Sequence, residues 1–428
     1  MQLWYAQAMT LSTPPPKGLH TDTRLLHADR LSHPEHGAVH KPLHTSSTFN
    51  YERAEDLVAV FQGSKPGYIY ARQGNPTTAA LEQQITLLER GTASASFATG
   101  MAAITAIFIS LLRSGDHVIS SQFLFGNTNS LFQTMEAFGV QFSFVDATDA
   151  SQVAAAIRPN TRMVFVETIA NPRTQVSDLV GIGEICNRHH LLYVVDSTLT
   201  TPILLRPKLI GAGLVVHSLT KSISGHGNAM GGSVTDTGRY DWSHYPHIYE
   251  SYKKGPPSTW GILQIRKKGL RDMGSTLRAE DAHRISVGAE TMRLRVPAAS
   301  RNALLVAQFL EAQPGIEKVY YPGLPSHEQY QRSVQLFSGY FGTLLSFELK
   351  PDRNPLEFLN RLNVVILSSH LSDTRTLAIP VAQTIYWEMG PSKRQAMGIS
   401  DGLIRLSVGI EAVEDLLEDL AQALQTGS

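Results

Sequence analysis

The sequence has one cysteine, no net charge and no apolar run of transmembrane length. Cys186 is the single cysteine among 428 residues, so an intramolecular disulfide framework is excluded. It lies in the helical pattern IGEICNRHH, and we expect a small core residue there and not a nucleophile. Lysine plus arginine and aspartate plus glutamate both number 37, so no overall field would attract nucleic acid or an anionic membrane. The N-terminus lacks the pattern of a signal peptide, and we expect a cytoplasmic protein.

Length and composition indicate a large globular chain. A chain of 428 residues predicts two to three domains, and a hydrophobic content of 42% is enough for extensive cores. One local cluster of basic residues is most simply a solvated face. Its members are Lys253, Lys254, Arg266, Lys267, Lys268 and Arg271.

Short apolar strands alternate with helical stretches in the middle of the chain. The strand-like segments QFSFVDA, RMVFVETIANP and LLYVVDSTLTTP are separated by helical patterns at about 150–157 and 178–189. This alternation predicts an α/β fold with a mostly parallel, doubly wound sheet. Residues 1–66 are rich in proline, histidine and serine and predict an extended arm. We expect a sheet domain at 67–280 and a smaller α+β domain at 281–428; whether the chain starts at Met1 or Met9 stays open.

Two successive strands of the predicted sheet end in residues that can do chemistry. The strand Leu191–Val195 leads into Asp196, and the stretch LVVHSLTKSISGHGNAMGG presents Lys221 after its own apolar run. Open α/β sheets bind ligands at the carboxyl ends of their strands, so both side chains are expected at one site. A lysine that forms a Schiff base and an aspartate that holds a pyridine nitrogen protonated are the pair that pyridoxal phosphate needs. Taken singly, the two residues also fit a surface lysine and a helix N-cap.

Other motifs do not predict a site. The segment TKSISG has no GxxxxGK pattern before its hydroxyl residue, so it is not a phosphate-binding loop of that kind. Gly181 and Gly183 begin a dinucleotide-binding pattern, but Cys186 occupies the third glycine position. His244 and His247 lack the HExxH context, and we expect no metal site.

The motifs VVDSTLTTP and VVHSLTKSISGH, in this order, resemble the trans-sulfuration family of pyridoxal phosphate enzymes. This family includes cystathionine synthases and lyases, methionine γ-lyase and O-acetylhomoserine sulfhydrylase. The resemblance runs from about Thr23 to the C-terminus. It implies the aspartate aminotransferase-like fold type I, with pyridoxal 5′-phosphate held on Lys221. It also implies a homo-oligomer, either a dimer or a homotetramer built as a dimer of dimers, in which the N-terminal arm wraps a neighbouring subunit.

The resemblance assigns three groups of residues to the cofactor phosphate. Tyr70 and Arg72, in the motif YARQGNPT, are expected to reach the phosphate of the partner subunit, where the planar arginine fork donates two charge-assisted hydrogen bonds. The backbone amides of Gly100 and Met101 open the helical pattern of FATGMAAITAIFISLL, and helix N-termini bind phosphate. Hydroxyls for the same phosphate are expected from Ser218 and Thr220.

Around the ring, the resemblance assigns three further residues. Asp196 is expected to pair with the pyridinium nitrogen, and Asn171, in ETIANP, to contact the cofactor 3-hydroxyl and the substrate carboxylate. Phe125 stands where the family normally has a tyrosine that stacks on the ring. Phenylalanine can stack but cannot exchange a proton, and positioned acid–base groups contribute about 10²–10⁴-fold in rate. The substitution therefore implies another acid, a leaving group that needs little protonation, or reduced activity.

On the substrate side, Arg405 in LIRLSVG aligns with the arginine that clamps the α-carboxylate. An ordinary ion-paired arginine is the alternative. The segment Ser369–Asp373 departs from the family pattern, because members that handle cystathionine carry a glutamate at the position of Ser369. Its absence favours a smaller thioether or a homoserine ester. His370 is expected either to act as a polar group near the substrate or to fill space.

From these features we predict γ-elimination or γ-replacement on a sulfur amino acid or an O-acylhomoserine, as in methionine γ-lyase or cystathionine γ-synthase. A carbon–sulfur lyase of the cystathionine β-lyase type is the alternative within the family. A paralogue that binds pyridoxal phosphate but has weak or altered chemistry is a second class of function that stays open.

Overall fold

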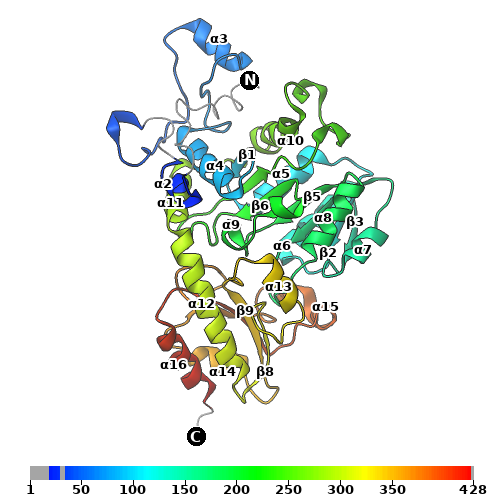
Figure 1. The fold of residues 1–428 in the computed structure, drawn as a ribbon, viewed down its shortest axis with the longest axis vertical. Coiled ribbons are helices and arrows are strands. Elements are labelled where there is room, and N and C mark those ends of the chain that lie inside the picture. The colour runs from blue at the N-terminus through cyan, green and yellow to red at the C-terminus, as the bar shows by residue number, and fades with distance from the viewer. Residues whose placement is uncertain (1–18, 29–33, 426–428) are drawn as a thin grey trace.

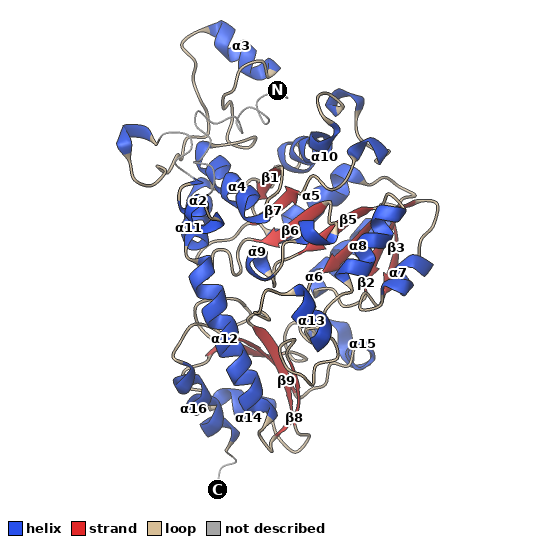
Figure 2. Ribbon diagram, viewed as in Figure 1, coloured by secondary structure: helices blue, strands red, loops and turns tan. Residues whose placement is uncertain are grey.

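The computed structural model of the chain describes residues 19–28 and 34–425. It contains two β-sheets, each covered by its own helices (Figure 2). The long helix α12 (Met292–Glu311) runs from the upper sheet region to the lower one and connects them (Figure 1). No helix within the described ranges is long and apolar enough to cross a membrane.

The first sheet has seven strands in the order β1-β7-β6-β5-β4-β2-β3. Only β7 runs antiparallel to its neighbours, so the prediction of a mostly parallel sheet is confirmed. The bounds are β1 (Ala93–Phe97), β2 (His117–Ser121), β3 (Gln141–Val145), β4 (Thr161–Glu167), β5 (Leu192–Asp196), β6 (Leu214–Ser218) and β7 (Gly232–Asp236).

Helices cover both faces of this sheet, because successive strand residues point to opposite sides. Val195 lies in the apolar core on one face, while Val194 lies in the core on the other. The same alternation holds for Val215 and Val216 on the next strand, so both faces of the sheet are buried as in a doubly wound fold. The surrounding helices are α4 (Pro76–Glu89), α5 (Gly100–Leu111), α6 (Gly126–Ala137), α7 (Ala150–Ala155), α8 (Leu179–Arg188), α9 (Thr201–Leu204) and α10 (Trp260–Gln264).

The second sheet has five strands in the order β10-β11-β12-β9-β8, and α12 and α16 pack against one another beside it. Its strands are β8 (Ile316–Tyr320), β9 (Leu344–Leu349), β10 (Ile366–Leu367), β11 (Leu377–Pro380) and β12 (Leu403–Ser407). The remaining helices of this half are α13 (Tyr330–Leu336), α14 (Pro355–Asn360), α15 (Gly390–Ala396) and α16 (Val413–Leu424). Helix α11 (Ala279–Glu290) packs against α4 and contributes to the core of the first sheet. The division of the chain at 66 and 280 stays a prediction.

Two short helices occur in the described part of the expected arm, α2 (Thr21–Leu26) and α3 (Ala54–Gln62). Leu25 is buried in the core beneath the first sheet, whereas α3 projects from the body of the molecule (Figure 1). Shorter helical segments are η2 (Glu35–Gly37), η3 (Pro207–Ile210), η4 (Trp242–His244), η5 (Glu250–Tyr252), η6 (Pro257–Thr259), η7 (Ile265–Arg271) and η8 (Trp387–Met389). The question of Met1 or Met9 falls outside the described residues.

The expected solvated basic face is wrong for two of its six members. Arg266 and Lys267 are 6% and 7% exposed, because η7, a π-helix, packs against α5 and turns both side chains inward. Arg266 forms an ion pair with Glu82, which satisfies its buried charge. Cys186 is 1% exposed in the core, and burial raises the pKa of its thiol, so the prediction of a core residue is confirmed.

Candidate active site

Asp196 and Ser218 end the neighbouring parallel strands β5 and β6, and Lys221 follows three residues beyond Ser218. The backbone N–H of Ser218 donates to Thr198 Oγ1 at 2.9 Å, which ties the two strand ends together. The lysine backbone N–H donates to the carbonyl of Ser218 in the turn that follows β6. The sheet therefore delivers the acid and the amine to one edge, as the sequence predicts.

The amine of Lys221 is partly buried, with its Nζ 3.2 Å from His370 Nδ1. Burial, with a smaller contribution from the positive charge of Arg405, lowers the pKa of Lys221 from 10.5 to about 8. A lowered pKa increases the fraction of neutral amine, which is the nucleophilic form. A solvated surface lysine would not show this environment.

Asp196 lies beside a second carboxyl group, that of Glu167, at the end of β4. Burial raises the pKa of Asp196, opposed by hydrogen bonding from Thr198, whose N–H donates to Asp196 Oδ1 at 2.9 Å. Burial and the neighbouring Asp196 raise the pKa of Glu167 to about 8. Burial therefore raises the pKa of both carboxyl groups, and the two titrate as a coupled pair.

The N-terminus of α5 packs closely against the end of β6 at the edge of the sheet. A Cβ placed on Gly100 would lie 2.8 Å from the Cβ of Ser218, so only glycine fits there. Thr99 caps the helix by accepting from the N–H of Ala102, and Met101 packs partly against the core. The first turn of α5 thus presents backbone donors beside a serine hydroxyl, a combination suited to an anion.

Thr220 turns its hydroxyl toward the backbone of the glycine-rich loop. Its Oγ1 accepts from the N–H of Gly231 at 3.0 Å. The prediction of a phosphate-binding hydroxyl at Thr220 stays a prediction, because this contact also fits a purely structural role.

Arg405 is a buried cation at the centre of the site. Its side chain, 2% exposed, donates to the backbone carbonyls of Ser369 at 2.8 Å and His370 at 3.1 Å, and it approaches Asn171 Oδ1 at 3.5 Å. Burial lowers its pKa to about 10. Among the described residues no carboxylate lies within ion-pair distance, so the ordinary ion-paired arginine is excluded there.

Phe125 precedes α6 and is held by a contact that sequence reasoning missed. Its backbone N–H donates to Glu167 Oε1 at 2.8 Å, which links the expected stacking ring to the carboxyl pair. Glu167 ends a parallel strand as Asp196 does, so the rule that found one carboxylate also points to the other.

Tyr386 is a second residue that was not predicted. It is 1% exposed, and its hydroxyl donates to the backbone carbonyl of Asn171 at 3.0 Å. It comes from the loop after β11, more than two hundred positions away along the chain. No local pattern could have indicated this contact.

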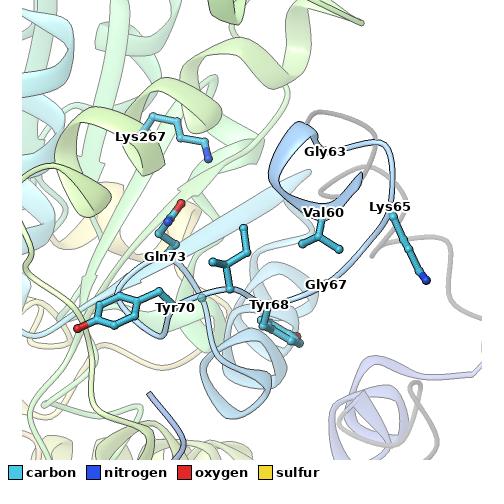
Figure 3. A pocket seen from close by; sticks show the side chains of 10 residues that line it. Val60, Gly63, Lys65, Gly67, Tyr68, Tyr70, Gln73 and Lys267 are labelled. Atoms are coloured by element: carbon cyan, nitrogen blue, oxygen red, sulfur yellow. The ribbon is translucent and has the colours of Figure 1, made fainter. Parts of the chain in front are cut away.

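The structure does not bring Tyr70 and Arg72 into the Lys221 cluster. Tyr70 is 44% exposed, its ring lies beneath the guanidinium of Arg72, and Arg72 donates to the carbonyl of Arg271 at 2.5 Å. Figure 3 shows Tyr70 with Gln73 and Lys267 at a surface pocket between α3 and the body of the chain.

The two histidines for which we expect no metal site, His244 and His247, each contact another side chain. His247 pairs with Asp116, while the ring of His244 stacks on His190 with 4.5 Å between centroids. Within the ranges that the structure describes, no group of three or more possible ligands is placed to hold a metal ion.

The parallel sheet, the buried amine and its neighbouring carboxylate define a pyridoxal phosphate enzyme of the α/β class. The model of the family "Cys/Met metabolism PLP-dependent enzyme" matches residues 22–425, and the chain belongs to this family. The prediction of a PLP-dependent carbon–sulfur lyase or transferase of trans-sulfuration type is therefore confirmed at the level of the family.

Two curated relatives illustrate the similarity. The chain is 37% identical over 410 residues to O-succinylhomoserine sulfhydrylase of Pseudomonas aeruginosa, covering 95% of this chain and 96% of the relative. It is also 37% identical over 408 residues to L-methionine gamma-lyase of Fusobacterium nucleatum subsp. polymorphum, covering 94% and 97%.

Solved structures agree. A putative O-acetylhomoserine (thiol)-lyase from Campylobacter jejuni, with N′-pyridoxyl-lysine-5′-monophosphate, superposes with a TM-score of 0.88 at 31% identity, covering 95% of this chain and 100% of that one. Cystathionine gamma-lyase from Lactobacillus plantarum complexed with L-serine gives 0.84 at 32% identity, covering 95% and 98%. The predicted fold class and the cofactor are confirmed.

Proposed function

We propose that the chain catalyses γ-elimination or γ-replacement on a sulfur amino acid or an O-acylhomoserine, with pyridoxal phosphate bound through Lys221. The single observation that carries the proposal is the arrangement around this amine. At the same sheet edge lies the acidic strand end of Asp196, and the charge acting on the amine comes from Arg405, a buried arginine that has no carboxylate of its own among the described residues.

The residues present fit the cofactor at both of its ends. At the phosphate end, Gly100 and Met101 offer backbone donors at the N-terminus of α5, and the tight approach of Gly100 to Ser218 leaves room for no side chain. At the ring end, Asp196 would accept a hydrogen bond from the pyridinium nitrogen, and Phe125 would supply an aromatic face. When bound, pyridoxal phosphate supplies an electron-poor ring that takes up the electron pair released at the substrate's Cα.

Arg405 binds the α-carboxylate of the substrate and so orients the amino acid. A buried guanidinium without an anionic partner is costly, and a carboxylate that enters the site with two parallel hydrogen bonds offsets that cost. Asn171, near the guanidinium at 3.5 Å, helps to fix the same group. Lys221 then accepts and returns the proton of Cα, because its lowered pKa keeps part of the amine neutral.

The segment after β10 favours a substrate without a distal amino group. The side chain of Ser369 carries no charge, and its backbone carbonyl already accepts a hydrogen bond from Arg405. A distal ammonium group would leave an unpaired charge beside Arg405, which is unfavourable in a desolvated site. Methionine and O-acylhomoserines avoid this, whereas cystathionine does not.

We also propose that the active site is completed by a second copy of the chain. Tyr70 is exposed and lies apart from Lys221, although an arginine and a tyrosine are well suited to a phosphate. Mixing a Lys221→Ala chain with an Arg72→Ala chain tests this, since a shared site restores partial activity in mixed oligomers. Activity that is never restored in mixed samples argues for sites within single chains.

The function is tested with a panel of substrates supplied to protein loaded with pyridoxal phosphate. The panel comprises methionine, O-acetylhomoserine with sulfide, O-succinylhomoserine with cysteine, cystathionine, and cysteine, with oxo acid, ammonia and thioether measured. We expect turnover of methionine or a homoserine ester, no turnover by Lys221→Ala, and weaker cofactor binding by Gly100→Ala. Preference for cystathionine supports the β-lyase alternative, for which the 36% identity to cystathionine beta-lyase of Coxiella burnetii is the favouring observation. If no substrate turns over, the protein is a cofactor-binding paralogue.

A further inference from the structure

The imidazole of His370 lies directly beside the reactive amine. The loop between β10 and β11 places its Nδ1 3.2 Å from Lys221 Nζ. Its backbone is held from two sides, because the N–H donates to Ser368 Oγ at 3.2 Å and the carbonyl accepts from Arg405 at 3.1 Å. The same arginine that is proposed to hold the substrate therefore also fixes the position of this ring.

The far side of the imidazole faces a carboxylate. His370 Nε2 is buried without a hydrogen-bond partner in the described part of the chain, and it lies 3.9 Å from Asp373 Oδ2. The side chain of Asp373 is 6% exposed, and Arg375 contacts its other oxygen, Oδ1, at 3.2 Å. Oδ2 is thus turned toward the imidazole, over Gly227, where an added Cβ would lie only 2.8 Å from it.

Three side chains therefore stand in a row: an amine, an imidazole and a carboxylate. An imidazole between a proton donor and a carboxylate is an arrangement suited to proton transfer, because the carboxylate stabilises the imidazolium that forms. The imidazole and the carboxylate of this row come from the loop between β10 and β11 of the second sheet. Phe125 comes from the opposite half of the chain and has no group that exchanges protons.

We propose that His370, oriented by Asp373, is the proton-transfer partner of Lys221 and replaces the hydroxyl that Phe125 lacks. The proposal deepens the function proposed above and rests on it. After Lys221 has taken a proton from Cα, the lysine ammonium passes that proton to Nδ1, which restores the neutral amine and leaves an imidazolium. The imidazolium then gives the proton to the departing sulfur or oxygen of the substrate, so that the proton lost by Cα is the one gained by the leaving group.

The charges around the ring agree with this role. Burial and the neighbouring Lys221 and Arg405 lower the pKa of His370, while Asp373 raises it. The net effect is a lowered pKa, so the ring is mainly neutral near pH 7 and free to accept a proton. Arg375 pairs with Asp373 from the solvent side and is the remaining charged group of this loop.

The first test is independent of turnover. Protein loaded with pyridoxal phosphate is titrated with base, and the midpoint of the change in visible absorbance is recorded for the native chain, His370→Leu and His370→Asn. Loss of an acceptor beside the protonated lysine nitrogen should lower the midpoint by about one pH unit in His370→Leu. The matched control is His226→Asn, since His226 is an exposed histidine of the glycine-rich turn that follows Lys221. An unchanged midpoint in His370→Leu overturns the proposal.

The second test uses the substrate that the native protein turns over. We expect kcat to fall by about 10²-fold or more in His370→Asn with KM changed little, and by about tenfold in Asp373→Asn. The acidic limb of the kcat profile against pH should disappear in His370→Asn and shift in Asp373→Asn, which a merely structural role would not produce. If the native protein turns over a substrate and His370→Asn has the same kcat, the role of His370 is refuted while the proposed function stands. If the native protein turns over no substrate, the proposed function itself is refuted. Circular dichroism and cofactor loading confirm that each variant is folded.

Discussion

The nucleophilicity of Lys221 depends on two features of its surroundings that can be altered separately. Burial is the larger cause of its lowered pKa and the positive charge of Arg405 the smaller one. With a pKa of about 8, roughly one amine in ten is neutral at pH 7, compared with about one in three thousand at the ordinary value of 10.5. Capture of an aldehyde requires the neutral amine, so the site gains about two to three orders of magnitude in reactive amine.

The perturbation is removal of the positive charge in Arg405→Met. Because this charge is the smaller cause, we expect the pKa of Lys221 to rise by a fraction of a unit, up to about one unit. The rate at which cofactor-free protein captures pyridoxal phosphate should then fall several-fold at pH 7 and recover at higher pH. In the native protein this rate should rise with pH through about 8 and level off above it.

The assay follows visible absorbance after mixing cofactor-free protein with pyridoxal phosphate at a series of pH values. Arg361→Met removes an exposed positive charge from the C-terminal half and serves as the matched control. A native profile that is still rising near 10 would show that the amine titrates like a free lysine, and the account of its activation by burial would then be refuted. A displaced profile in the Arg361→Met control would show that the effect of Arg405 is not local.

Three further outcomes follow from the structure. Glu89→Ala breaks the buried pair in which His217 Nε2 lies 2.5 Å from Glu89 Oε1, and urea unfolding should show a loss of about 3–5 kcal/mol. Asp419→Ala should cost about 2 kcal/mol in the same assay, because Asp419 accepts three backbone N–H groups. Burial alone would raise the pKa of Asp419, but these hydrogen bonds lower it below the ordinary value of 3.8. The stabilisation from the ionised Asp419 is therefore complete above the pKa of the unfolded chain, and it should be lost as the pH falls through the lower pKa of the folded chain. Phe125→Tyr should raise kcat only slightly when His370 is present, but it should raise kcat about tenfold or more in the His370→Leu variant. Two independent positions would show the same effect in both backgrounds.

Much of the fold could be predicted from the sequence because its signals are local. The alternation of apolar strands with helical stretches predicts the parallel order of β2 to β6, and polar residues at strand ends indicate where a ligand binds. Asp196 and Lys221 lie at the same edge of the sheet because β5 and β6 are neighbouring parallel strands. The basic cluster was misjudged at Arg266 and Lys267, since the burial of a charged side chain depends on partners that are distant in the chain, such as Glu82.

The substrate side of the site was less predictable for the same reason. His370 was expected to be a polar group near the substrate or a space filler, and its contact with Lys221 joins positions 149 residues apart. Tyr386 and Glu167 were missed, although Glu167 obeys the strand-end rule that revealed Asp196.

The sequence by itself determined the family, the cofactor, and the acid and amine that follow two adjacent strands, because each is encoded in a short run of neighbouring positions. Only the tertiary structure decided which charged groups lose water, that two carboxyl groups lie side by side, and that an imidazole faces the amine. Those properties arise because groups distant in the chain share one desolvated space and set each other's protonation.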